Sequence, residues 1–260
     1  MIPDLLAALV KESEAETAER RALVSREELE RRAGALAPAR DFAAALAAPG
    51  LSVVAEMKAR TPTMGVLAEL YRPAQLARSY ERAGAAAISV LAQKTSFGGC
   101  PEHVAEARAA CSLPVMRKDF VTDAYQVLEA RAFGADAVLL IVAALGQARL
   151  RELLAETRRL GMEALVEVHD EAEVAAAVAA GARVIGVNHR DLRTFAVDGG
   201  LTARLRPLVP AYCLVVAESG IGDAEGARRA REAGADAVLV GEALMRAADP
   251  GAKIRELVVR

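Results

Sequence analysis

The pattern of apolar and polar positions repeats along most of this chain. Four Gly-Ala pairs, each followed by a short apolar run, occur about 50 residues apart. Each glycine fits a left-handed residue that ends a helix before the next strand begins. A regular internal period of this length indicates one β-α-β-α unit repeated four times. The glycines of the four pairs are Gly84, Gly134, Gly181 and Gly234.

Eight strands are expected from this period. Four follow the Gly-Ala pairs, and the other four lie at residues 51–57, 114–117, 164–168 and 212–217. All are short and rich in Val, Ile, Leu and Ala, as in parallel strands that are buried on both faces. Helical patterns connect them, and the whole set occupies about 210 residues, which predicts an α/β protein with a (β/α)8 TIM barrel. A doubly wound sheet is the rival fold, but it predicts no fourfold period, and its glycine fingerprint after the first strand is absent.

We divide the chain into a helical extension, residues 1–50, and the barrel, residues 51–260, which together make one domain. Asp4 is a candidate cap for a first helix with an apolar cluster near its start and a charged run on its solvated side. Ser25 and Glu28 have the spacing of a capping box, in which each side chain satisfies the other residue's amide. Asp41 is expected to cap a third, short helix.

Composition and charge narrow the possible partners. The chain has 260 residues, of which 53% are hydrophobic and 26% charged, and its net charge is -2 with both signs interleaved. This balance gives no footprint for nucleic acid or an anionic membrane. Three widely spaced cysteines suit neither a disulfide framework nor a zinc site. Without a basic leader or an apolar run of about 20 residues, we expect a cytoplasmic protein with no metal.

The segment 114–120 places two adjacent cations at the end of a buried strand. Alternate side chains share a face, so Lys118 points to one side of the sheet and Arg117 to the other. A desolvated ion costs several kcal/mol unless it is paired. One of these cations must therefore be buried or lie at the strand end, where barrels carry out their chemistry.

Other strand ends carry polar residues of the same kind. Because the carboxyl ends of barrel strands meet at one mouth, we expect two lysines and three carboxylates to converge there and exchange protons with one substrate. The alternative for any single residue is a rim salt bridge worth under about 1 kcal/mol. The residues in question are Glu56, Lys58, Gln93, Lys118, Glu167, Asn188 and Glu218.

The loops after the seventh and eighth strands contain small residues that suit an anion. Ser219-Gly220 and Gly241-Glu242 allow backbone amides to approach a phosphate at a helix N-terminus. Ordinary turn glycines are the alternative. His169, two residues after Glu167, is more typical of rim structure than of catalysis. Arg190 either ties loops together or helps to orient substrate.

Taken together, these segments resemble the indole-3-glycerol-phosphate synthase family, and they follow one another in order over nearly the whole chain. The resemblance implies ring closure of 1-(2-carboxyphenylamino)-1-deoxyribulose 5-phosphate with loss of carbon dioxide and water, without a cofactor. The segments that carry it are Ala55–Lys58, Pro114–Phe120, Leu165–His169, Gly186–Asn188, Glu218–Ile221 and Val240–Met245.

Residue roles follow from the same resemblance. It implies that Lys118 is the general acid, that Lys58 holds the carboxylate and assists dehydration, and that Glu167 is the acid/base for loss of the hydroxyl. The positioning residues are Glu56, Asn188 and Glu218, and the residues that bind phosphate or substrate are Ser219, Gly220, Gly241, Glu242, Arg190 and Thr61.

The chain departs from the family pattern beside the expected aromatic end of the substrate. Ala92-Gln93 stand where Thr-Glu is common, and Ala59 and Met64 stand where basic residues are common. One hypothesis is therefore a paralogue of a specialised pathway with altered rate or substrate tolerance. Two further alternatives are a phosphoribosylanthranilate isomerase and a non-catalytic phosphosugar-binding barrel. The expected partner is a small phosphorylated substrate, and the expected state is a monomer or weak homodimer.

Overall fold

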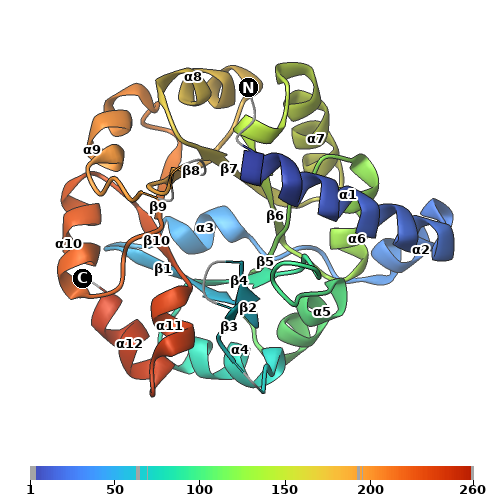
Figure 1. The fold of residues 1–260 in the computed structure, drawn as a ribbon, viewed down its shortest axis with the longest axis horizontal. Helices are drawn as coiled ribbons and strands as arrows, with labels where there is room; N and C mark the ends of the chain where they lie inside the picture. Colours follow the sequence, from blue (N-terminus) through green and yellow to red (C-terminus); the bar gives the residue numbers. More distant parts are fainter. Residues whose placement is uncertain (1–3, 63–64, 69, 192–193, 195, 259–260) are drawn as a thin grey trace.

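A closed barrel of eight parallel strands forms the centre of the computed structural model, which describes residues 4–62, 65–68, 70–191, 194 and 196–258 (Figure 1). The predicted barrel is confirmed, and the strand order is β1-β10-β9-β8-β7-β6-β5-β4. The strands are β1 (Ser52–Met57), β4 (Ala87–Leu91), β5 (Val115–Lys118), β6 (Ala137–Ile141), β7 (Glu163–Val168), β8 (Val184–Asn188), β9 (Leu214–Glu218) and β10 (Ala237–Val240).

Helices surround the barrel and end at the predicted glycines. Gly84, Gly134, Gly181 and Gly234 all have positive φ, between +85° and +93°. The helices after β1 are α4 (Pro73–Arg82), α5 (Pro101–Ala110), α6 (Ala124–Ala132), α7 (Gln147–Arg159), α8 (Glu171–Ala180), α9 (Leu201–Leu205), α10 (Ala224–Glu232), α11 (Glu242–Arg246) and α12 (Pro250–Leu257), with 3-10 turns at Val142–Ala144 and Arg206–Leu208.

One small element was not predicted. The antiparallel pair β2 (Arg60–Thr61) and β3 (Gly65–Val66) lies in the loop after β1. Strands of two residues are too short to produce a readable alternation of apolar and polar positions. Thr63 and Met64, which lie between them, are outside the described residues.

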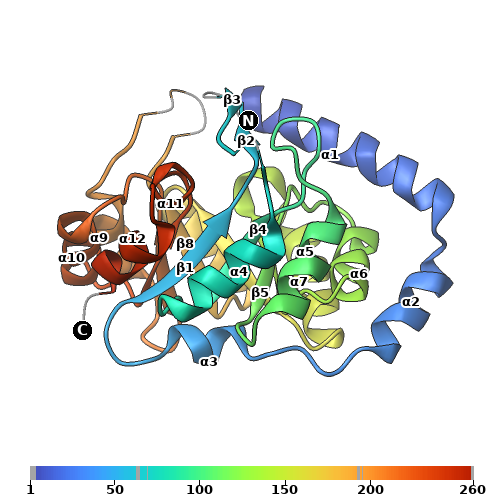
Figure 2. The same ribbon diagram turned by 90° about the horizontal axis from the view of Figure 1, so that it is seen from below.

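Apolar side chains pack in two layers, one between strands and helices and one inside the barrel. The inner layer includes Val54, Met116 and Leu165. It is closed at one end by Phe42 of α3 (Phe42–Leu46) and at the other by Leu6 of α1 (Asp4–Leu23), and both side chains are buried. Figure 2 shows α1 across the mouth that carries β2 and β3, with α3 at the opposite end.

The N-terminal helices differ in part from expectation. The charged run of α1 was expected to face solvent, but Ser13, Glu16 and Thr17 are buried, because that side of the helix faces the barrel loops. The side chain of Asp4 is outside the described set.

The caps of the next two helices agree with the predictions only in part. At α2 (Arg26–Ala35), Ser25 accepts from the Glu28 amide as predicted, but the Glu28 carboxylate turns to Arg31 and Arg32 instead of completing a capping box. Asp41 caps α3 as predicted. In the part of the chain that the structure describes, no helix is both long and apolar enough to cross a bilayer.

Candidate active site

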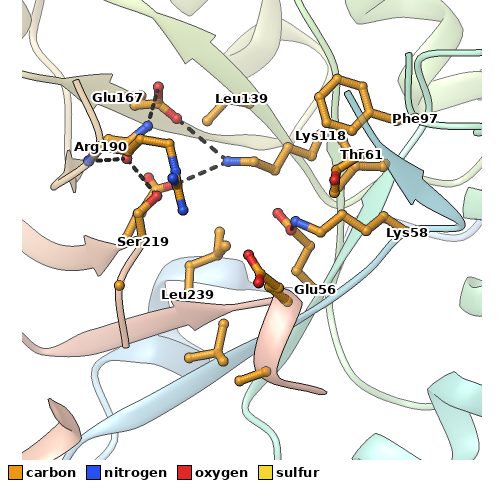
Figure 3. A pocket seen from close by; sticks show the side chains of 18 of the residues that line it. Glu56, Lys58, Thr61, Phe97, Lys118, Leu139, Glu167, Arg190, Ser219 and Leu239 are labelled. Carbon is orange, nitrogen blue, oxygen red and sulfur yellow. Dashed lines mark hydrogen bonds and ion pairs between the residues drawn. The ribbon is translucent and has the colours of Figure 1, made fainter. Parts of the chain in front are cut away.

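A cavity of about 740 Å³ opens at the carboxyl ends of the strands (Figure 3), and Leu5, Leu6 and Leu9 of α1 contribute to its lining. Its polar lining comes from five different strands and includes Glu56, Lys118, Glu167, Asn188 and Glu218. A volume of this size lies in the range of small-molecule sites. The predicted gathering of strand-end residues at one mouth is therefore present.

Lys118 lies between two carboxylates at the centre of this mouth. Its Nζ is 3.0 Å from Glu218 Oε2 and 3.5 Å from Glu167 Oε2, and both glutamates are almost fully buried. Burial alone lowers the pKa of Lys118, but the Glu218 and Glu167 carboxylates outweigh burial and raise the pKa above its ordinary value. The side chain is therefore a protonated ammonium at neutral pH.

The neighbouring cation, Arg117, forms ion pairs outside the cavity. It is fully buried on the outer side of the strand, where it binds Asp119 at 2.7 Å and Glu129 at 2.8 Å. Asp119 also accepts a hydrogen bond from Ser13 of α1. The expectation that one of these cations is buried or lies at the strand end is met by both, because Arg117 is buried and Lys118 is the last residue of β5.

The two glutamates around Lys118 have opposite pKa shifts. Burial, together with the nearby charge of Glu167, raises the pKa of Glu218 to about 7 against the opposing effect of Lys118. For Glu167 burial acts in the same direction, but Lys118, His169 and Asn188 outweigh it and leave the pKa below its ordinary value. Two carboxyl groups with different proton occupancy at one site can act as acid and base.

One carboxylate oxygen of Glu218, Oε1, lies against Gly186, which is not part of the cavity lining. Among the described residues, none forms a hydrogen bond with its buried Oε1 atom. A Cβ atom at Gly186 would overlap this oxygen, so the glycine leaves the room that the carboxylate occupies. Buried polar atoms without partners are rare and costly, which accords with the burial that raises the pKa of Glu218.

Lys58 forms the second cationic group of the mouth. Its Nζ lies 2.5 Å from Glu56 Oε1, with both side chains largely buried. A Cβ atom at Gly241 would overlap the same Glu56 oxygen, so Glu56 is confined between the lysine and the loop after β10. Glu56 near the end of β1 and Lys58 just after it therefore both lie at the mouth, as expected of strand-end residues.

Asn188 links the acid/base end of the cavity to the glycine-containing loops. Its Nδ2 donates to Glu167 Oε1 at 3.1 Å, and its Oδ1 accepts from Ser219 Oγ at 2.8 Å and from the Arg190 amide at 3.1 Å. Arg190 and Thr61 both line the cavity. The predicted site residues Asn188, Arg190 and Thr61 thus all line the same cavity.

The loops after β9 and β10 form the opposite wall. Ser219 and Gly220 have φ of 68° and 73°, a left-handed turn that serine adopts only under constraint. Gly241 precedes α11, and the Glu242 carboxylate lies 3.4 Å from Arg246. The Glu242 carboxylate thus has a cation beside it, and the Ser219–Gly220 and Gly241–Glu242 turns border the cavity.

His169 has a closer relation to the site than its sequence position suggested. Its Nε2 lies 3.4 Å from Glu167 Oε1, and its Nδ1 lies 3.1 Å from Glu173 Oε2. Burial lowers the pKa of His169, but the carboxylates of Glu173 and Glu167 outweigh it and raise the pKa. The Glu-x-His spacing was the available signal, and only the structure shows the approach of Nε2.

Gln93 does not join the cavity, because its side chain turns toward α1. Among the described residues, no group of three or more His, Cys, Asp or Glu side chains is arranged to hold a metal ion.

Comparisons with known proteins show the family to which a chain with this site belongs. The family model "Indole-3-glycerol phosphate synthase" matches residues 6–257. The chain belongs to the indole-3-glycerol phosphate synthase family. It is 61% identical to "Indole-3-glycerol phosphate synthase 2" of Streptomyces coelicolor over 98% of both chains. It is 48% identical to the synthase of Mycobacterium avium, over 98% of this chain and 93% of that protein.

Solved structures with lower identity share the fold. A thiamine phosphate pyrophosphorylase from Pyrococcus furiosus matches with a TM-score of 0.62 and 20% identity, over 80% of this chain and 93% of that one.

The family match makes this chain an indole-3-glycerol phosphate synthase, a decarboxylating carbon-carbon lyase of tryptophan biosynthesis. Its substrate is a phosphorylated small molecule.

Proposed function

We propose that the cavity closes the indole ring of 1-(2-carboxyphenylamino)-1-deoxyribulose 5-phosphate, with Lys118 as the general acid. The observation that carries this assignment is the position of the Lys118 ammonium, 3.0 Å from Glu218 and 3.5 Å from Glu167 inside the cavity. Among the described residues that line the cavity, no other lysine forms ion pairs with two buried carboxylates.

The substrate is held at both ends. Its phosphate binds at the turns Ser219–Gly220 and Gly241–Glu242, with Glu242 contributing its backbone amide, and its carboxylate binds Lys58. The aromatic ring then lies among apolar side chains such as Phe97 and Leu139, which line the cavity. Fixing both ends folds the flexible ribulose chain toward the ring, and such positioning supplies up to about 7–11 kcal/mol of the barrier.

Ring closure uses the Lys118 proton. The ring carbon that bears the carboxylate attacks the ribulose carbonyl carbon, a carbon-carbon bond forms, and the carbonyl oxygen takes a proton from Lys118 to become a hydroxyl. The carboxylate then leaves as carbon dioxide, and its bonding electrons restore the aromatic ring. A positioned acid of this kind contributes roughly 10²–10⁴ in rate.

Dehydration completes the reaction. The new hydroxyl leaves as water while the adjacent CH2 carbon, which lies between the hydroxyl-bearing carbon and the nitrogen, loses a proton, so one acid and one base are required. Glu167 is the acid/base partner in this step, and Lys58 assists. Glu56 orients Lys58, and Asn188 and Glu218 orient Glu167 and Lys118 through the contacts described above. Arg190 and Thr61 contribute to substrate binding from the rim.

A direct assay tests the proposal. Purified protein is mixed with the carboxyphenylamino ribulose phosphate, and indole fluorescence is followed together with released carbon dioxide. We expect one carbon dioxide for each indole product. Binding of the substrate without either product would favour a phosphosugar-binding barrel and refute the catalytic assignment.

Altered tolerance for substituents on the ring is a second candidate. Support comes from Gln93, whose amide contacts shape the loop that carries Phe97 into the cavity. The test compares kcat/KM for plain and ring-substituted substrates with that of a relative that has glutamate at this position. Equal selectivity in the two enzymes would rule the candidate out.

A further inference from the structure

The loop between β4 and α5, residues 92–100, meets α1 through one buried side chain, Gln93. Figure 2 shows this loop beside α1 at the mouth of the barrel. Gln93 is fully buried although it lies outside the cavity lining. A buried amide in such a place needs partners for all its polar atoms.

Every hydrogen-bonding position of the Gln93 amide is occupied. Its Nε2 donates to Glu12 Oε2 and to Glu16 Oε1, both at 3.0 Å. Its Oε1 accepts from the amides of Ser96 at 2.8 Å and Phe97 at 3.2 Å. Since two carboxylates require donors and two N–H groups require an acceptor, the partners fix the orientation of the amide.

The two carboxylates on α1 hold the same loop by further bonds. Glu16 accepts from the amides of Lys94 at 3.0 Å and Thr95 at 2.8 Å, and from the Thr95 hydroxyl at 2.7 Å. Glu12 accepts from the Ser96 hydroxyl at 2.7 Å. Helix and loop therefore form one hydrogen-bonded unit, with Gln93 as its buried centre.

Both halves of this unit reach the cavity. α1 supplies Leu5, Leu6 and Leu9 to the lining, and the loop supplies Phe97. We propose that Gln93 is a positioning residue that holds α1 and Phe97 together as the wall over the aromatic end of the substrate, and that its uncharged amide is required for this. The identity of the group beneath the wall rests on the proposed function.

Replacing Gln93 by glutamate tests whether the uncharged amide, and not only the shape of the side chain, is required to position α1 and Phe97. It has the same shape and still accepts from the Ser96 and Phe97 amides, but it has no hydrogen to donate to Glu12 and Glu16. Three carboxylates would then share one partly buried site, which strongly raises the pKa of one of them. A shared proton at low pH restores one of the two lost hydrogen bonds.

Few other charged groups surround Gln93, Glu12 and Glu16. Arg20 lies 4.0 Å from Glu16 on the same helix, and Lys94 contacts Glu16 through its backbone while its side chain is exposed. From the loop after β5, the Asp119 carboxylate accepts a hydrogen bond from Ser13 of the helix. A third carboxylate therefore adds negative charge where two glutamates already face it.

The experiment compares Gln93→Glu with the wild-type enzyme at pH 6 and pH 8. As a matched control, Gln75→Glu places the same change on the exposed surface of α4. We expect KM of Gln93→Glu to rise about tenfold at pH 8 and about threefold or less at pH 6, with a much smaller change in kcat. The Gln75→Glu variant should match the wild type at both pH values.

A compensating change tests whether charge is the cause. In Gln93→Glu/Glu16→Gln the donor moves to the helix, and we expect KM at pH 8 to recover at least threefold. Equal KM values for Gln93→Glu and wild type, or a rise in KM that neither low pH nor Glu16→Gln reduces, would overturn the proposal.

Hydrogen exchange of α1 provides a reading that is independent of turnover. We expect faster amide exchange in residues 5–12 of Gln93→Glu at pH 8 than in wild type, after correction for the intrinsic rate at that pH. If Gln93→Glu does not fold, Glu12→Ala/Glu16→Ala removes the helix side of the contact and should show the same faster exchange. Unchanged exchange in the tested variant would refute the positioning role of Gln93, whereas an absence of turnover in wild type would refute only the proposed function.

Discussion

Glu218 makes the stability of this protein depend on pH in a way that one substitution removes. The side chain is about 2% exposed and its pKa is raised to about 7, against an ordinary value of 4.5. Between these two pH values the folded state binds more protons than the unfolded state. The free energy of unfolding contributed by this group therefore falls as pH rises from 4.5 to 7, and it stays constant above pH 7.

The size of this effect follows from the two pKa values. Their difference of about 2.5, at about 1.4 kcal/mol for each pH unit, corresponds to about 3 kcal/mol. Glutamine at position 218 keeps the shape and does not titrate. In this variant Lys118 keeps Glu167 as a partner, and the pKa of Lys118 lies above the tested pH range. The ion pair that Lys118 loses with Glu218 therefore changes the free energy of unfolding by nearly the same amount at every tested pH.

The assay is calorimetry of Glu218→Gln and wild type at several pH values from 5 to 8. From pH 5 to 8 about 2.5 kcal/mol of this effect is lost, and with about 2–4 °C for each kcal/mol in a chain of this size, Tm of the variant relative to wild type should rise by about 5–10 °C across the range. Glu19→Gln on the exposed side of α1 is the control and should follow the wild type. Parallel Tm curves for Glu218→Gln and wild type would refute the reasoning.

Three further substitutions test the surroundings of the site. Gly241→Ala places a Cβ atom over Glu56 Oε1 and 2.9 Å from Glu56 Cδ, and a displaced carboxylate should lower kcat/KM about 10–100-fold with the fold intact by circular dichroism. Arg117→Met leaves buried Asp119 without its cation and Glu129 with Arg20 alone, and it should reduce the free energy of unfolding by about 3–5 kcal/mol in urea titrations. His169→Asn removes a charge that lowers the pKa of Glu167, so the acid limb of the kcat/KM profile should move to higher pH. An unchanged result in any of these measurements would contradict the corresponding contact.

Local sequence signals predicted the barrel and most of the mouth. The glycines that end helices, such as Gly84 and Gly234, require a left-handed conformation that few other residues adopt. A parallel barrel then brings all strand ends to one side, so Lys118 and Glu167 meet although 49 residues separate them in sequence. The barrel topology alone is enough to predict that these two residues lie at the same mouth.

Contacts between polar side chains that are far apart in the chain could not be predicted from the sequence. Glu16 stands in a charged helical run and was interpreted as solvent-exposed, because its partner Gln93 lies 77 residues away. The approach of His169 Nε2 to Glu167 depends on the orientation that Glu173 gives the ring. The reciprocal bond of the α2 capping box failed because Arg31 and Arg32 compete for Glu28.

Single-turnover kinetics of Lys118→Met test the central claim most directly. We expect substrate affinity to remain within about threefold of wild type, and indole formation to slow by roughly 10²–10⁴. Lys11→Met, on the exposed surface of α1, should change neither quantity. Indole formation by Lys118→Met within a few-fold of the wild-type rate would contradict the assignment of the general acid.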